Sequence, residues 1–171
     1  MAGVSEDAGG ERLETARLEL FPLAPEAAAA LSDDRDQAAR IIRATLHPDW
    51  PHPNLLDALP MHAAAAAEDA RFGIWVILER ASDTVIGDIG FFGPPTPEAT
   101  VEIGYSVVPD RRRRGYATEA AAALVDWAHR QPNVSAVLAR CEEDNLPSIR
   151  TLERLGFARR GKIDQMLAWR L

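Results

Sequence analysis

The residues with the clearest chemical potential are four arginines followed by a glycine, residues 111–115. They stand in a chain with a formal net charge of −7, so the overall composition does not account for them. Gly115 lets the backbone turn tightly and approach a ligand without a Cβ in the way. The helix expected after it presents unpaired N–H groups and the positive end of its dipole. These features predict an anion site, and a diphosphate is the anion that suits it best.

Two other interpretations of the arginine run stay open from its residues alone. The arginines can form a solvated charged turn that binds nothing. They can also form a nucleic-acid patch, which is disfavoured because interleaved aromatic residues and a wider basic face are missing. The run follows neither the P-loop pattern GxxxxGK[ST] nor the dinucleotide pattern GxGxxG.

The elements around this turn belong to the second half of the chain. Runs rich in β-formers at 72–79, 84–92 and 100–108, joined by short polar links, predict an antiparallel meander. Behind Gly115 the apolar residues follow a single helical stripe. That stripe consists of Ala117, Ala120, Ala121, Leu124 and Ala128. A strand over 133–141, a helix over 145–155 and two strands about a turn near 161–164 complete this half.

The first half is predicted to begin with a strand at 17–23 and two short helices. The segment HPDWPHPN at 47–54 has three prolines and is expected to be a loop, and a third helix is expected over about 55–71. The whole order predicts a mixed α/β (α+β) fold with one β–α–β crossover in its second half.

Composition limits the class of protein. With 171 residues and 47% hydrophobic residues, we expect a single domain over 13–171 behind a disordered tail at 1–12, which lacks the apolar region of a signal peptide. One cysteine excludes an internal disulfide and suits the reducing cytoplasm. No apolar run approaches the roughly 18 residues of a spanning helix, so no membrane partner is expected. The acidic balance disfavours a nucleic-acid partner.

Two separated blocks carry a family resemblance. The pattern Q/R-x-x-G-x-G/A is satisfied by Arg112, Arg113, Arg114, Gly115, Tyr116 and Ala117, and a pattern N-x-x-S followed by G-F is satisfied by Asn145, Ser148, Gly156 and Phe157. On these residues the sequence resembles the GNAT superfamily of N-acetyltransferases. Residues 114–120 and 102–105 resemble its Rim-type branch, the ribosomal-protein N-terminal acetyltransferases.

The resemblance implies a mostly antiparallel sheet of six to seven strands flanked by helices, with acetyl-CoA as cosubstrate. It implies that residues 112–117 and Thr118 bind that molecule, and that backbone amides at Val107 and Val108 hold its pantetheine arm and polarise the thioester carbonyl. Asn145 is expected both to cap a helix and to contact the pantetheine. Many family members carry a tyrosine, proposed as general acid, where this chain has Leu152.

Acetyl transfer to an amine needs a neutral amine, and a carboxylate in the site suits that task. Glu102 is the candidate base, since it alternates with apolar neighbours and lies in the strand before the arginines; the alternative is a solvent-facing strand residue. Ser148 is the candidate partner of the coenzyme A sulfur; the alternative is a first-turn serine bonded to the backbone.

The cysteine and the histidines are predicted to take no part in catalysis or metal binding. Cys141 lies on an apolar strand with no assignable base, so it is predicted to be a buried, inert thiol. The spacing of His47, His52 and His62 fits no zinc pattern, and no metal is predicted. A further hypothesis is that Trp50 and its prolines line the acceptor pocket.

The predicted function is therefore acetyl transfer from acetyl-CoA to a primary amine, foremost the α-amine of a protein or peptide. A small-molecule amine acetyltransferase and a non-catalytic acyl-CoA-binding module are the alternatives. The sequence leaves open whether the protein is a monomer or a homodimer.

Overall fold

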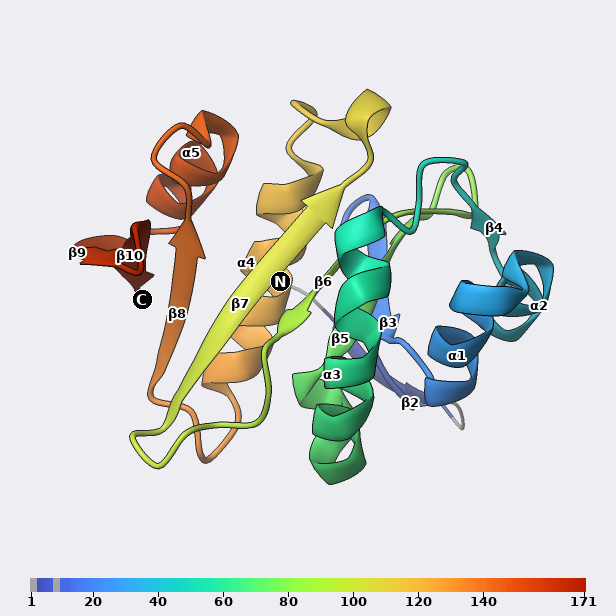
Figure 1. Ribbon diagram of the computed structural model, residues 1–171, viewed down its shortest axis with the longest axis horizontal. Helices are drawn as coiled ribbons and strands as arrows, with labels where there is room; N and C mark the ends of the chain where they lie inside the picture. The colour runs from blue at the N-terminus through green and yellow to red at the C-terminus, as the bar shows by residue number, and fades with distance from the viewer. Residues whose placement is uncertain (1–2, 8–9) are drawn as a thin grey trace.

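The computed structural model describes residues 3–7 and 10–171, which form a ten-stranded sheet with helices on both faces (Figure 1). The strands are β1 (Gly3–Asp7), β2 (Gly10–Glu14), β3 (Leu18–Pro22), β4 (Thr45–Leu46), β5 (Ile74–Glu79), β6 (Thr84–Phe91), β7 (Thr100–Val107), β8 (Ala136–Cys141), β9 (Ala158–Ile163) and β10 (Met166–Arg170). The helices are α1 (Pro25–Asp33), α2 (Arg35–Ile42), α3 (Pro53–Asp69), α4 (Tyr116–His129) and α5 (Leu146–Arg154), with short 3₁₀ turns at Ala70–Phe72 and Pro109–Arg111.

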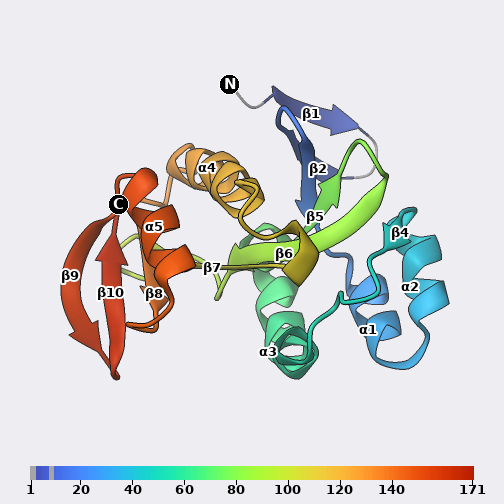
Figure 2. The same ribbon diagram turned by 90° about the horizontal axis from the view of Figure 1, so that it is seen from above.

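The strands are ordered β1-β2-β3-β5-β6-β7-β8-β10-β9, and β4 pairs with β6. The β7–β8 and β4–β6 pairs are parallel and the other pairs are antiparallel. Seen from above, α4 lies on one side of the sheet and α3 on the other (Figure 2). The predicted mixed fold with a β–α–β crossover is confirmed, and β1, β2 and β4 raise the strand number above the six to seven expected.

The N-terminal segment differs from the disordered tail expected at 1–12. Over the residues that the structure describes, Gly3–Asp7 and Gly10–Glu14 form an antiparallel hairpin whose second strand also pairs with β3. Leu13 is fully buried, and Glu11 accepts a hydrogen bond from the indole of Trp127 on α4. A single apolar anchor inside an acidic stretch is too weak a pattern to predict this pairing. The single domain from residue 13 onward stays a prediction.

The proline-rich segment at 47–54 is a loop for most of its length, but α3 begins inside it. Pro53 occupies the first helical position, where its missing N–H costs nothing. His52 is the N-cap, and its Nδ1 accepts the Leu55 N–H at 3.2 Å. The loop that carries Trp50 and His52 is therefore tied directly to a helix.

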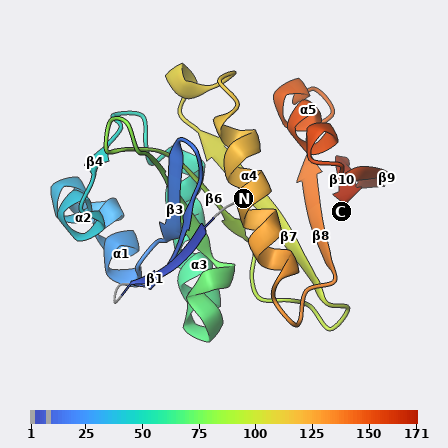
Figure 3. The same ribbon diagram turned by 180° about the vertical axis from the view of Figure 1, so that it is seen from behind.

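Helix α4 packs on the sheet through its predicted alanine stripe and through Trp127. The Trp127 ring lies 5.3 Å from those of Phe72 and Trp75 and 5.9 Å from that of Phe91. Such pairs contribute about 0.5–1.5 kcal/mol each beyond the area they bury. Figure 3 shows α4 in front of the sheet and roughly aligned with β7, so this packing fixes where its N-terminus lies. None of the described helices is long and apolar enough to cross a membrane.

Candidate active site

Strands β7 and β8 are paired over only the first half of β7. The paired residues run from Thr100 with Ala136 to Ile103 with Ala139. Strand β7 then continues to Val107 beside β6, without a described partner on its other side. Figure 1 shows the two strands diverging toward the ends that lead into α4 and α5. This opening leaves backbone hydrogen-bonding groups of β7 available to a ligand.

The residues that face the opening follow from the alternation of backbone groups along a strand. The Glu102 carbonyl and the Val108 N–H both bond toward β6, at 3.1 and 2.9 Å. Tyr105 and Val107 therefore direct their N–H and C=O groups into the opening, where Arg112 Nε donates to the Val107 carbonyl at 2.8 Å. We expected the amides of both Val107 and Val108 to hold a ligand. The structure leaves that of Val107 for this role and uses that of Val108 within the sheet.

Helix α4 begins without a side-chain cap. Its N-cap, Gly115, has a φ of 81°, a left-handed conformation that glycine adopts without strain. The first helical bond runs from the Glu119 N–H to the Gly115 carbonyl at 3.0 Å. The N–H groups of Tyr116, Ala117 and Thr118 are therefore free of helical partners. Together with the helix dipole they form the anion-binding geometry that the sequence predicts.

The four arginines of the turn have different surroundings. Arg111 forms an ion pair with Glu79, and Arg112 donates to the Val107 carbonyl. Arg113 and Arg114 are exposed, and their guanidinium groups donate to no described residue. The geometry thus makes Arg113 and Arg114 the cations that are available to a phosphate.

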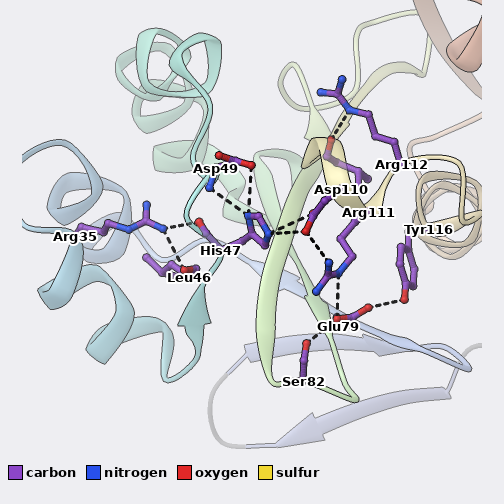
Figure 4. A network of polar contacts seen from close by, with 11 residues as sticks. Arg35, Leu46, His47, Asp49, Glu79, Ser82, Asp110, Arg111, Arg112 and Tyr116 are labelled. Carbon is purple, nitrogen blue, oxygen red and sulfur yellow. Dashed lines mark hydrogen bonds and ion pairs between the residues drawn. The ribbon is translucent and has the colours of Figure 1, made fainter.

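A buried carboxylate anchors the turn from below (Figure 4). Glu79, at the end of β5, is 8% exposed and accepts hydrogen bonds from Ser82 Oγ at 2.6 Å and from the Tyr116 hydroxyl. Arg111 Nε lies 3.4 Å from the same carboxylate. The bonds from Ser82 and Tyr116 lower the pKa of Glu79, and the bond to Glu79 raises the pKa of Tyr116. Glu79 therefore stays ionised and Tyr116 stays a donor at neutral pH.

Asp110 connects this turn to the loop before α3. Its carboxylate is 2.8 Å from Arg111 Nη1 and 3.2 Å from His47 Nε2 (Figure 4). His47 is thus engaged with an acid of the turn. His52, whose spacing from His47 was considered for a zinc site, lies elsewhere on the loop. The side chain of His62, the third histidine considered, lies outside the described residues.

Arg17 holds the turn from the other side. Its guanidinium lies 4.3 Å from the centre of the Tyr116 ring and pairs with Glu119 at 2.7 Å. Its Nη1 donates to the Arg114 carbonyl at 2.9 Å. Arg17, Glu79 and Tyr116 therefore position the backbone of the turn, and sequence analysis assigned none of the three side chains this role. Arg17 and Glu79 could not be identified from the sequence because they are far from the turn along the chain.

Ser148 and Asn145 meet at the start of α5. Asn145 Oδ1 accepts the Ser148 N–H at 3.2 Å, which confirms Asn145 as the N-cap. Ser148 Oγ lies 3.0 Å from the hydroxyl of Tyr105, which comes from the unpaired part of β7. Burial raises the pKa of Tyr105, so its phenol stays neutral. Two hydroxyl groups thus meet beside the opening. Leu152, at the position where many family members carry a tyrosine, is buried.

Glu102 lies in the paired part of β7, away from the groups just described. Its carboxylate forms an ion pair with Arg140 Nε at 2.7 Å, and it lines neither of the cavities described below. Its assignment as the base stays a prediction. Cys141 is buried, as expected for a thiol on an apolar strand.

Two adjoining cavities lie along the α3 side of β7. The larger, of about 350 Å³, is formed by the loop at 48–53 and by residues 106–109 and Arg112. The smaller, of about 220 Å³, is lined by residues of α3, β5, β6 and β7, and Asp88 is one of them. His52 and Ser106 line both cavities. Trp50, hypothesised to line an acceptor pocket, lines the larger cavity.

Comparison with known proteins decides the family. Residues 17–158 match the Acetyltransferase (GNAT) domain. The chain belongs to this family. It is 33% identical to the N-acetyltransferase YjdG of Bacillus subtilis (strain 168). The alignment spans 160 residues and covers 92% of this chain and 95% of the relative. The solved acetyltransferase of Agrobacterium tumefaciens str. C58 is 26% identical with a TM-score of 0.66, over 94% of this chain and 93% of that one.

The GNAT fold is also shared with more distant structures. The ribosomal-protein-S5-alanine acetyltransferase from Vibrio fischeri has a TM-score of 0.68 at 16% identity, over 94% of this chain and 95% of that one. As a GNAT N-acetyltransferase the chain uses acetyl-CoA, which confirms the predicted enzyme class and cosubstrate. The uncapped start of α4 and the unpaired edge of β7 fit the pyrophosphate and the amides of that molecule.

Proposed function

We propose that this GNAT enzyme acetylates the α-amine of a peptide or protein, and that it does so in the cytoplasm. The observation that carries the proposal is the smaller cavity on the α3 side of β7. Its volume of about 220 Å³ is below the roughly 300–1,000 Å³ typical of pockets that enclose a whole small ligand. Such a cavity suits the first residue of a chain whose remainder extends outside.

The residues divide into two proposed roles. The amides of Tyr116, Ala117 and Thr118, with Arg113 and Arg114, bind the pyrophosphate. Acetyl-CoA supplies the thioester, and placing the amine beside it provides most of the acceleration. The hydroxyl of Ser148, hydrogen-bonded to Tyr105, stabilises or protonates the leaving sulfur. Membership of the Rim-type branch stays a prediction.

A peptide with both a free α-amine and an internal lysine tests the acceptor class. Purified enzyme and acetyl-CoA should release thiol with this peptide, and fragmentation in the mass spectrometer should place the acetyl group on the α-nitrogen. The same peptide blocked at its N-terminus should release no thiol above background. Faster turnover with spermine or other small amines, or acetylation of the lysine alone, would refute the α-amine proposal.

A further inference from the structure

Asp88 is a buried carboxylate on the α3 face of the sheet that binding of acetyl-CoA does not explain. It is 8% exposed and lies in β6 opposite Ser106 of β7. Trp50 Nε1 donates to Asp88 Oδ2 at 2.8 Å. No described residue donates to Oδ1, and Asp88 lines the smaller cavity. Oδ1 is not one of the buried side-chain atoms without a partner, so this oxygen is open to the cavity, where a ligand can reach it.

His52 supports the same carboxylate from the loop. Its Nδ1 accepts the Leu55 N–H, so the neutral ring carries its proton on Nε2. Nε2 is buried, has no hydrogen-bond partner among the described residues, and lies 3.5 Å from Asp88 Oδ2. In the neutral ring Nε2 therefore carries a proton and points its N–H toward Asp88 Oδ2. It cannot act as a base in this state. Trp50 and His52 thus both lie on the Oδ2 side of Asp88, and no described residue donates to Oδ1.

The position of Asp88 relative to the opening in the sheet completes the argument. Its register partner, Ser106, lies in the part of β7 that β8 leaves unpaired, and Ser106 and His52 line both cavities. The larger cavity adjoins Val107 and Arg112 at the phosphate-binding turn. An acceptor in the smaller cavity would therefore meet the thioester near Ser106, with Asp88 beside it.

We propose that Asp88 is the catalytic base of the acceptor site and that Trp50 and His52 are positioning residues for it. The proposal rests on the proposed acetyl transfer. The lone pair of the acceptor nitrogen forms a bond to the acetyl carbon, the carbon–sulfur bond breaks with its electrons going to sulfur, and a proton of the nitrogen moves to Asp88 Oδ1. Glu102, tied to Arg140, is the competing base.

The same cavity defines the acceptor more closely. Besides the polar Asp88, His52, Asn54 and Ser106, the cavity is lined by the apolar side chains of Leu55, Ile74 and Phe92. Ile89 and Phe91 border it with their backbone, because their side chains point to the α4 face. The cavity therefore suits a primary amine next to an uncharged apolar group. A peptide that begins with Asp or Glu would bring a second carboxylate to Asp88 and should be a poor acceptor.

The decisive experiment compares Asp88→Asn with Glu102→Gln in the full-length enzyme. Asparagine has the same shape and still accepts the Trp50 hydrogen bond, so the fold should survive. With acetyl-CoA and a peptide that begins with alanine, Asp88→Asn should lower kcat/KM by about 100-fold or more while the Kd for coenzyme A changes by less than about twofold. Glu102→Gln should lower kcat/KM much less than Asp88→Asn does, because Glu102 is ion-paired with Arg140 and lines neither cavity. Asp57→Asn, on the exposed side of α3, is the matched control.

Each outcome is informative. Normal turnover in Asp88→Asn, or a larger loss in Glu102→Gln, overturns the assignment of Asp88 while leaving the proposed function intact. Failure of the wild-type enzyme to acetylate any peptide overturns the proposed function instead. A readout without turnover is the Trp50 indole N–H signal in NMR, with coenzyme A present. Adding the alanine-initiated peptide should shift this signal in wild type and not in Asp88→Asn, and an unchanged signal in wild type would place the acceptor elsewhere.

Discussion

Glu79 in β5 accepts a hydrogen bond from the hydroxyl of Tyr116 in the first turn of α4, although 37 positions separate the two residues. The bond joins the buried centre of the sheet to the helix end that presents free amides. Because Arg111 also lies within ion-pair distance of this carboxylate, two side-chain contacts hold the turn of residues 111–115 in place.

Replacing Glu79 with glutamine should therefore loosen the turn. The new amide group would bring its N–H donors against donors of Ser82 or Arg111, and Arg111 would lose its counter-charge. We expect the free energy of unfolding to fall by about 1–3 kcal/mol and coenzyme A to bind more weakly. Urea denaturation and calorimetry measure the two effects, and the exposed Glu98→Gln is the control. Unchanged affinity for coenzyme A would contradict the anchoring role.

Gly115→Ala tests the left-handed conformation at the start of α4. An added Cβ would meet Arg17 Nη2 at 3.4 Å, an ordinary contact, so the cost comes from the positive φ and amounts to about 1–2 kcal/mol. Gly161 also has a positive φ with open space around it, but lies on β9. Both alanine variants should lose stability in urea, and Gly115→Ala alone should lose affinity for coenzyme A. Equal affinities would show that the turn does not contact the phosphates.

The arginines of the turn should separate into two classes. Arg113→Gln and Arg114→Gln remove exposed cations and should each weaken coenzyme A binding by about two- to tenfold without changing the melting temperature. Arg111→Gln should lower the melting temperature, because it leaves the buried Glu79 without its cation. Added salt should reduce the effects of Arg113→Gln and Arg114→Gln. A fall in melting temperature with either of these two would be the contrary result.

The histidine of the acceptor cavity gives a pH-dependent signal. The interaction of His52 with Asp88 raises its pKa above the ordinary 6.5, against burial and the charge of Arg112. A group whose pKa is raised on folding stabilises the fold fully below 6.5 and loses that contribution as the pH rises through the folded value. NMR titration should show the His52 pKa above 6.5 in wild type, lower in Asp88→Asn and higher in Arg112→Gln. A wild-type value below 6.5 would contradict this pairing.

Ser148→Ala tests the proposed donor to the sulfur. Loss of that hydroxyl should lower kcat by about 100-fold if it acts as an acid, with little change in coenzyme A affinity. Tyr105→Phe keeps the ring and removes the hydrogen bond to Ser148, so its effect on kcat should be smaller. Thiol-release assays at saturating substrate measure kcat for both variants. Full activity in Ser148→Ala would show that solvent, and not Ser148, protonates the leaving sulfur.

The tight glycine turn before α4 could be predicted because its signals are local. A glycine, a run of arginines and a helical stripe lie within one stretch of chain, and the GNAT pattern adds a second block around Asn145 and Ser148. The order of the main strands and helices along the chain could be predicted for the same reason, since each main strand has its own β-rich run. The β1–β2 hairpin could not be predicted, because its sequence is mostly acidic and small residues without a β-rich run.

The side chains that position the turn and the proposed base could not be predicted from local sequence signals. Arg17, Glu79 and Asp88 act across strand pairs and helix ends far from the turn along the chain, and each stands in an ordinary strand-like context. The difference between Val107 and Val108 is likewise a matter of strand register, which decides which amide the sheet consumes. Pairing between distant segments sets these roles, and a single sequence does not record it.

The central claim is that main-chain N–H groups at the start of α4 bind the pyrophosphate of coenzyme A. Titration of coenzyme A into ¹⁵N-labelled protein, followed by amide NMR, tests it most directly. The amide signals of Gly115, Tyr116, Ala117 and Thr118 should shift most, with that of Val107 following and that of Gly161 unchanged. Signals at these amides that stay in place while others move would contradict the account.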